Sequence, residues 1–268
     1  AAPLGRHLSA MVENDQPLTV EQARAALLAG RFSPQSADVP RFGIGSAPAW
    51  LHLAVDNDGP EPARRQLQIE ASWLDRIDVH LLHDGRVVSQ DTAGDAVPGA
   101  ALPHPGLGYL VDLVLPPGRN DLLVRIATPD TMVVPLRLLD AAQLKTLQRQ
   151  TDYMFGFLYG FLLALIGYNA MLWFGLRERS FLDYTLYVGG FLLLNLCYTG
   201  HGYIYLWPRS QFIQQYCIPV MMVVSGCAGL RFADGFLQLK EHLPGAHRFV
   251  RGLTFAGLAG MLVTVLLL

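Results

Sequence analysis

Two tryptophans with polar neighbours are the residues best suited to bind a small molecule. Trp50 is followed by His52, and Trp73 is followed by Asp75 and Arg76. An exposed indole can stack on a sugar ring while charged or imidazole groups hold its hydroxyls, so the pattern indicates a carbohydrate-like ligand. Large aromatic side chains are mostly buried, so packing in the core is their more common role. Both interpretations stay open for each tryptophan.

Catalytic and metal-binding motifs are missing from the sequence. It contains no Walker loop, no His-Glu-x-x-His, no Cys-x-x-Cys and no Gly-x-Ser-x-Gly. His80 and His83 are three residues apart in a predicted strand, where side chains at that spacing point to opposite faces. That geometry argues against a shared metal ion. We therefore expect no enzyme active site, no metal and no cofactor in this chain.

A second set of polar residues interrupts long apolar runs in the second half of the chain. These residues are Asn169, Asp183, Asn195, His201, Arg231 and Asp234. Polar groups inside a membrane usually bond to a neighbouring helix and hold the bundle together. The more specific alternative is that these residues form an ion or proton pathway. The i,i+3 spacing of Arg231 and Asp234 predicts a local ion pair.

Composition changes sharply near residue 150. Residues 1–151 hold 13 Lys/Arg and 17 Asp/Glu, whereas residues 152–268 hold 7 and 5. The slightly acidic first half argues against nucleic acid, because binding to phosphates needs clustered Lys and Arg. The three cysteines all fall in the apolar half, so the first half cannot depend on a disulfide or a Cys-bound metal.

The first half alternates apolar and polar residues with a period of two. In the run Trp50–Asp56, Leu51, Leu53 and Val55 point to one face, and Trp50 and His52 point to the other. Similar runs cover 66–71, 76–82, 86–89, 109–115, 121–127 and 132–138, with a hairpin signal at Asp84-Gly85. One short helix is predicted at 20–29, after the capping-box pattern Thr19–Gln22. These elements predict an all-β sandwich over residues 1–140, for which we prefer a jelly roll to an immunoglobulin-like topology.

The second half reads as a bundle of transmembrane helices. Tyr153–Gly175 contains no Asp, Glu, Lys or Arg, and a helix of that length crosses the hydrocarbon core of about 30 Å. We predict spans at about 153–176, 181–206, 212–235 and 249–268. Residues 141–152 have no Gly or Pro and form the predicted helical connector between the sandwich and the first span.

The charges of the connections predict how the chain is oriented. One side collects five Lys/Arg at 177–179 and 240–251, and the other has only Arg209 in the turn after Trp207. The positive-inside rule therefore places the sandwich outside the cytoplasm. A start at Ala1 without Met fits a processed exported protein. The apolar run that reaches Leu268 leads us to expect a C-terminally truncated sequence, with further spans beyond it.

Motifs in the right order resemble the bacterial seven-transmembrane receptors with diverse intracellular signalling modules. They are Tyr168-Asn169, Arg177–Tyr184, Gly200–Gly202 with Tyr205–Pro208, and Arg231–Leu237. The strand Trp50–Asn57 resembles the jelly-roll extracellular domain of the family's second type. The resemblance implies a periplasmic sensor in the bacterial inner membrane, with a ligand of carbohydrate-like chemistry. It also implies a cytoplasmic output outside this chain, such as a diguanylate cyclase, a histidine kinase or a phosphatase.

We therefore expect a non-enzymatic, membrane-anchored receptor in which the connector passes a ligand-induced change to the spans. One alternative is a periplasmic module that docks another protein and binds no small ligand. Another is a transporter or its accessory subunit. A homodimer is left open.

Overall fold

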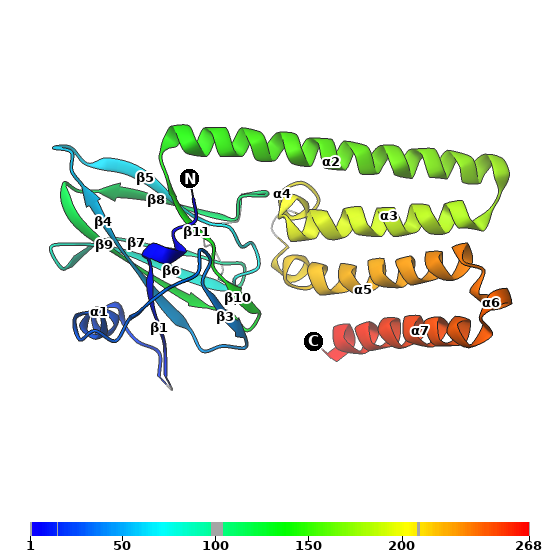
Figure 1. The fold of residues 1–268 in the computed structure, drawn as a ribbon, viewed down its shortest axis with the longest axis horizontal. Helices are drawn as coiled ribbons and strands as arrows, with labels where there is room; N and C mark the ends of the chain where they lie inside the picture. The colour runs from blue at the N-terminus through cyan, green and yellow to red at the C-terminus, as the bar shows by residue number, and fades with distance from the viewer. Residues whose placement is uncertain (1, 15, 98–103, 208–209, 268) are drawn as a thin grey trace. The chain divides into compact units, whose positions relative to one another are not determined.

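The computed structural model describes residues 2–267 apart from 15, 98–103 and 208–209. It contains two compact units, Ala1–Thr151 and Asp152–Leu268. The first is built mainly of strands and the second of helices (Figure 1). Arg209 and Leu268, which entered the predictions of orientation and of the fourth span, lie outside the described residues.

The first unit is a β-sandwich of the jelly-roll kind. Its strands are β1 Ser9–Val12, β2 Ser33–Pro34, β3 Arg41–Ile44, β4 Ala49–Asn57, β5 Ala63–Ile69, β6 Arg76–His83, β7 Arg86–Ala93, β8 Tyr109–Leu115, β9 Gly118–Ala127, β10 Thr131–Val133 and β11 Leu136–Leu139. One antiparallel sheet has the order β2-β1-β4-β9-β6-β7, a second has the order β11-β5-β8, and β10 pairs with β3. From β4 onward the chain passes repeatedly between the two larger sheets. The predicted sandwich is confirmed.

The core of the sandwich is built by the alternation that the sequence predicts. Leu51 and Leu53 of β4 are buried in it, and Val55 packs against it. Leu67 and Ile69 belong to the same cluster, on the second sheet. Because successive residues of a strand point to opposite faces, the neighbouring Trp50 and His52 lie on the outer face of the six-stranded sheet.

Helix α1 (Val20–Leu28) covers part of that outer face. The Thr19 hydroxyl accepts a hydrogen bond from the Gln22 N–H, and the Gln22 side chain accepts one from the Thr19 N–H, which confirms the capping box. The helix buries its alanine face against the sheet in a second apolar cluster of Ala23, Ala26, Phe32, Trp50, Leu82 and Leu123. A tryptophan on an outer face can therefore be buried.

The run 132–138 differs from the single strand predicted there. β10 pairs with β3, and β11 pairs with β5. Pro135 lies between β10 and β11, and a proline has no N–H to continue a strand ladder, so the chain changes sheets there. The short strands β1 and β2 were not predicted, because too few residues alternate in them to give a period.

The second unit contains most of α2 (Ala141–Leu176), then α3 (Arg179–Tyr198), α4 (His201–Tyr205), α5 (Gln211–Phe236), α6 (Leu239–His242) and α7 (Pro244–Leu267). By length and hydropathy, three described stretches could cross a membrane: Ala141–Leu176, Arg179–Tyr198 and Tyr216–Phe236. The fourth predicted span falls in α7. The second predicted span, 181–206, is divided in the structure because Gly200 adopts φ +82° after α3 and ends the helix.

The long helices of this unit lie side by side (Figure 1). Leu158 and Leu162 of α2 pack with Val188 and Leu192 of α3. α3 in turn packs along α5, where Gly190 allows a close approach: a Cβ at this position would lie 3.3 Å from the Ser225 Cα. Small residues at such crossings are typical of helices that associate within membranes.

Candidate functional site

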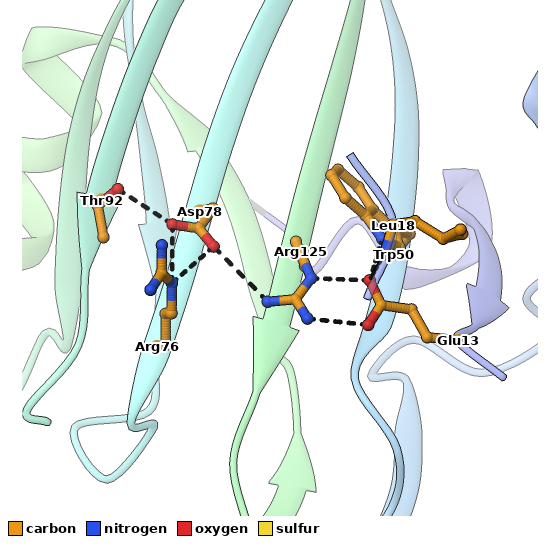
Figure 2. Close-up of polar contacts among 7 residues, drawn as sticks. All are labelled: Glu13, Leu18, Trp50, Arg76, Asp78, Thr92 and Arg125. Carbon is orange, nitrogen blue, oxygen red and sulfur yellow. Dashed lines mark hydrogen bonds and ion pairs between the residues drawn. The ribbon is translucent and has the colours of Figure 1, made fainter. Parts of the chain in front are cut away.

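The outer face of the six-stranded sheet carries a buried network of charges (Figure 2). Arg125 of β9 donates from Nε to Glu13 Oε1 and from Nη2 to Glu13 Oε2, both at 2.8 Å. Its Nη1 lies 3.8 Å from Asp78 of β6. Arg76 Nε and the Thr92 hydroxyl also donate to the Asp78 carboxylate. Glu13 and Asp78 are both buried, so the network supplies partners for charges that could not otherwise leave water.

Glu13 is held in its charged form. Burial alone raises the pKa of Glu13, but hydrogen bonds from Arg125, from the Leu18 N–H and from the Trp50 indole outweigh burial and lower the pKa. The hydrogen bonds to Glu13 raise the pKa of Arg125 against the effect of burial, and the charges of Glu13 and Asp78 raise it as well. Arg125, Arg76, the Thr92 hydroxyl and the Trp50 indole each donate to a carboxylate within the network. The cluster is therefore suited to fixing the segment after β1 to the sheet.

Trp50 lies inside this network and not on an exposed binding surface. Trp50 is 1% exposed, its indole donates to Glu13 Oε1 at 2.7 Å, and its ring stacks on that of His80 with 5.8 Å between the ring centroids. The structure thus supports the core interpretation of Trp50, and a sugar-stacking role does not fit. His52 lies between Ser9 and Asp121, with its Nε2 2.9 Å from Asp121 Oδ1. It too has partners within the protein.

Trp73, Asp75 and Arg76 lie away from the Trp50 cluster. Trp73 is half-buried, packs against the core between the sheets and donates from its indole to the Thr131 carbonyl at 3.1 Å. Asp75 accepts a hydrogen bond from the Thr128 hydroxyl, and Arg76 belongs to the network around Asp78. The structure therefore does not bring the two predicted tryptophan sets together into one site.

Three aspartates from different loops lie near one another: Asp75 precedes β6, Asp95 follows β7 and Asp130 follows β9. Burial, together with the charges of Asp75 and Asp130, raises the pKa of Asp95 to about 7. Burial and Asp75 likewise raise the pKa of Asp130. Among the described residues, no group of three or more His, Cys, Asp or Glu is arranged to hold a metal ion.

A polar groove that sequence reasoning missed lies on the outer face of the three-stranded sheet. Its volume is about 560 Å³, and it is bounded by β5, β8 and the first turns of α2. Its charged and amide side chains are Arg64, Arg65, Gln66, Asp112, Lys145 and Gln148. All of them belong to the first unit. The only sequence signal was the polar character of alternate residues in β5, which is equally typical of a solvated face.

In the helical unit, the predicted polar residues divide into two groups. Asn169 and Asn195 bond to carbonyls one turn back in their own helices, Leu165 and Phe191. Among the described residues, neither side chain has a hydrogen bond to a neighbouring helix, so a bridging role for the two amides stays a prediction. An amide in a helix can reach the carbonyl four residues earlier, which provides an acceptor for one of its two N–H groups within the same helix.

His201 does join separate helices. Its Nδ1 lies 3.2 Å from the Tyr159 hydroxyl of α2 and 2.8 Å from the Thr199 hydroxyl. Phe155 and Tyr159 pack edge-on against its ring. The contacts of His201 therefore connect α2 with the turn between α3 and α4.

Arg231 and Asp234 do not form the predicted local ion pair. Arg231 Nε donates to Asp183 Oδ1 of α3 at 2.9 Å, and Asp234 lies 2.7 Å from His247 Nδ1 of α7. The local prediction was wrong because partners on α3 and α7 reach these side chains. The two pairs tie α5 to a helix on either side.

Comparisons with known proteins agree with this division of the chain. The family described as 7TMR-DISM extracellular 2 matches residues 5–140, and the one described as 7TM diverse intracellular signalling matches residues 151–268. No curated protein gave a significant match.

Solved structures similar to the first unit include sugar-binding modules. The CBM35 of Paenibacillus barcinonensis has 11% identity and a TM-score of 0.28, covering 52% of this chain and 97% of its own. The CBM35 of Cellvibrio japonicus Abf62 has 15% identity and a TM-score of 0.26, covering 52% and 88%. The chitosan-binding module 1 of Paenibacillus sp. IK-5 has 15% identity and a TM-score of 0.26, covering 52% and 100%.

Proposed function

Because the chain belongs to the 7TMR-DISM family, with its second type of extracellular domain followed by its 7TM region, we propose that it is a ligand sensor of the bacterial inner membrane. The sandwich stands in the periplasm and binds a small, carbohydrate-like molecule. The helices carry the change to a cytoplasmic output module of the diguanylate cyclase, histidine kinase or phosphatase kind. The chain described here acts without catalysis of its own.

The observation that carries this proposal is the extent of α2. The helix begins at Ala141, directly after β11, and ends at Leu176, after the first apolar run. One side of its first turns lines a surface groove with Arg137 and Leu139 of β11, through Ala142, Gln143, Thr146, Leu147 and Gln150. A helix is stiff over such a length, whereas a Gly- or Ser-rich linker would lose any displacement in its own flexibility. If the first turns of α2 move relative to the sandwich, the membrane-spanning part of the same helix therefore moves with them.

Ligand binding can alter such a receptor only by favouring one of two arrangements. The start of α2 is the natural place for two arrangements, because it contacts the sandwich through few buried apolar side chains: most of residues 141–150 are exposed. The interior of the sandwich, by contrast, is closely packed and has little freedom to shift.

The test interrupts α2 and measures ligand-dependent output of the receptor in cells. Gly-Gly-Ser inserted after Thr151 should abolish the response while expression stays normal. An insertion of Ala-Ala-Ala-Ala at the same place is the matched control, because it lengthens the helix without softening it. A normal response with the Gly-Gly-Ser insertion would rule out coupling through the helix.

Placement of the sandwich outside the cytoplasm is tested by labelling. Asp84 lies in the β6–β7 hairpin with its side chain 88% exposed, and the natural cysteines are Cys197, Cys217 and Cys227 of the helical unit. Asp84→Cys should react with a membrane-impermeant maleimide once the outer membrane is made permeable. Labelling only after lysis of the inner membrane would contradict the sensor proposal.

A further inference from the structure

We propose that the groove between the outer face of β5 and β8 and the first turns of α2 binds a small hydroxylated anion. This inference rests on the proposed sensor function and gives it a site. The ligand carries a carboxylate or phosphate for the basic side chains of the groove and hydroxyl groups for its amides.

The register of the sheet places four of the groove residues on its outer face. Arg64 lies opposite Val114, and Gln66 lies opposite Asp112. Both pairs point away from the core, because the alternate residues Leu113 and Leu115 are buried in it. Lys145 and Gln148 of α2 form the opposite wall. The volume of about 560 Å³ is within the range of small-molecule sites.

The charge of the groove is positive. Two cationic side chains, Arg64 and Lys145, line it with a single carboxylate, Asp112. Arg65 also borders the groove, but it lies opposite the core residue Leu113, so its side chain points to the other face of the sheet. Within the described part of the chain, no acidic side chain forms an ion pair with Arg64 or Lys145. Asp112 is instead hydrogen-bonded by the Gln66 amide at 2.6 Å. Like charges gathered in one groove repel each other, and a bound anion relieves that repulsion.

Unsatisfied polar atoms mark the same face of the sheet. Gln66 Oε1, Gln68 Oε1 and Arg137 Nε are enclosed and have no hydrogen-bond partner. Gln68 and Arg137 lie directly opposite each other on β5 and β11. An enclosed polar atom without a partner costs free energy, and a ligand that supplies donors and acceptors to Gln66 offsets part of that cost. Of these three residues, Gln66 is the one that lines the groove, so its Oε1 is the acceptor available to a ligand there.

The position of the groove explains how binding would reach the membrane. An anion held by Arg64 on β5 and by Lys145 on α2 connects the sandwich to the helix that becomes the first span. Binding therefore favours the arrangement in which α2 lies close to β5 and β8. The ligand need not deform the sandwich itself.

The experiment measures binding to the whole chain in nanodiscs of zwitterionic lipid by isothermal titration calorimetry. The probes are glucuronate and glucose 6-phosphate, with glucose as the neutral reference. We expect at least one anion to bind at least about tenfold more tightly than glucose, with an affinity that falls as salt is raised. Whichever anion binds more tightly distinguishes a carboxylate ligand from a phosphate ligand.

Two variants with opposite expected effects locate the site. The double variant Arg64→Gln, Lys145→Gln should weaken anion binding by at least about tenfold, because two charge-assisted hydrogen bonds are lost. Asp112→Asn should strengthen it several-fold, a result that misfolding cannot produce. The matched control is Arg86→Gln, Arg149→Gln, which removes the same charge from exposed positions of a strand and of α2 outside the groove.

The outcomes separate this inference from the proposed function. Equal binding of anions and glucose, no anion binding, or full binding by the Arg64, Lys145 double variant would overturn the groove as an anion site. The sensor function would then still be decided by the insertion after Thr151. Groove-dependent binding with an unimpaired Gly-Gly-Ser receptor would instead keep the site and reject the proposed relay.

Discussion

Arg125 and Glu13 are 112 positions apart in the chain and form a bidentate ion pair. Both of its hydrogen bonds are 2.8 Å long. Arg125 lies on the central strand β9, and Glu13 directly follows β1, which pairs with β2 on one side and β4 on the other. The pair fixes the N-terminal segment that leads into α1, and the indole of Trp50 adds a third hydrogen bond to the same carboxylate. Figure 2 shows how Asp78 extends this network along the sheet.

Glu13→Gln should destabilise the sandwich by about 3 kcal/mol, the lower end of the range for a buried ion pair that loses one partner. The lower end applies because Asp78 remains 3.8 Å from Arg125 and still offsets its charge. Urea denaturation followed by tryptophan fluorescence measures the change. Glu61→Gln, at an exposed turn position, is the control, and equal midpoints for the two variants would contradict the prediction.

Acid should unfold the sandwich partly through Glu13. Its pKa lies below the ordinary value of 4.5 in the folded protein, so the unfolded chain takes up the proton first as pH falls. The stabilisation is complete above about pH 4.5 and is lost as pH falls through the folded pKa. Thermal melts between pH 3 and pH 6 should show this loss in the wild type and a shallower one in Glu13→Gln.

Asp95 should have the opposite pH dependence. Its pKa rises from 3.8 to about 7 on folding, so between these values the folded protein holds a proton that the unfolded chain has lost. Stability therefore falls as pH rises through this window and then levels off. At pH 8, Asp95→Asn should be more stable than the wild type by roughly 1 to 2 kcal/mol after solvent screening. Chemical denaturation at pH 5 and pH 8 tests this, with exposed Asp58→Asn as the control; an unchanged pH dependence in Asp95→Asn would refute it.

Asp183 and Arg231 should be energetically coupled across α3 and α5. Their hydrogen bond is 2.9 Å long, and Asp183 is buried. A double-mutant cycle with Asp183→Asn and Arg231→Gln in detergent should give a coupling of about 1 kcal/mol, within the range for polar contacts in membranes. The cycle of Arg231→Gln with Asp234→Asn is the comparison. A larger coupling for that second pair would restore the local ion pair that the structure rejects.

Gly190→Leu should disrupt the packing of α3 on α5, whereas Gly189→Leu should not. A Cβ at position 190 would lie 3.3 Å from the Ser225 Cα, a backbone atom that cannot move aside, while nothing lies within 4 Å of a Cβ at position 189. The two variants add the same apolar bulk at adjacent positions. Thermal aggregation in detergent should begin at a lower temperature for Gly190→Leu alone, and similar behaviour of both would mean that the close crossing is not required.

Periodic patterns in the sequence predict which elements form. Alternation in 50–56, 76–82 and 109–115, the capping box at Thr19 and the uncharged run after Tyr153 each depend on residues close in the chain. Local spacing decides which face of a strand is apolar and how long an apolar helix is. For this reason the β-sandwich, the helix at 20–28 and the apolar helices that follow agree with the sequence predictions.

Only the tertiary structure determines which strands β10 and β11 pair with and which partners the polar side chains meet. No spacing in the sequence joins Glu13 to Arg125, Asp183 to Arg231 or Arg64 to Lys145, because each pair is formed by segments that pack together only after folding. The same applies to Trp50: its outward position follows from its strand, but its burial depends on α1 closing over that face. A one-dimensional pattern records which way a side chain points, and only tertiary packing determines what it meets there.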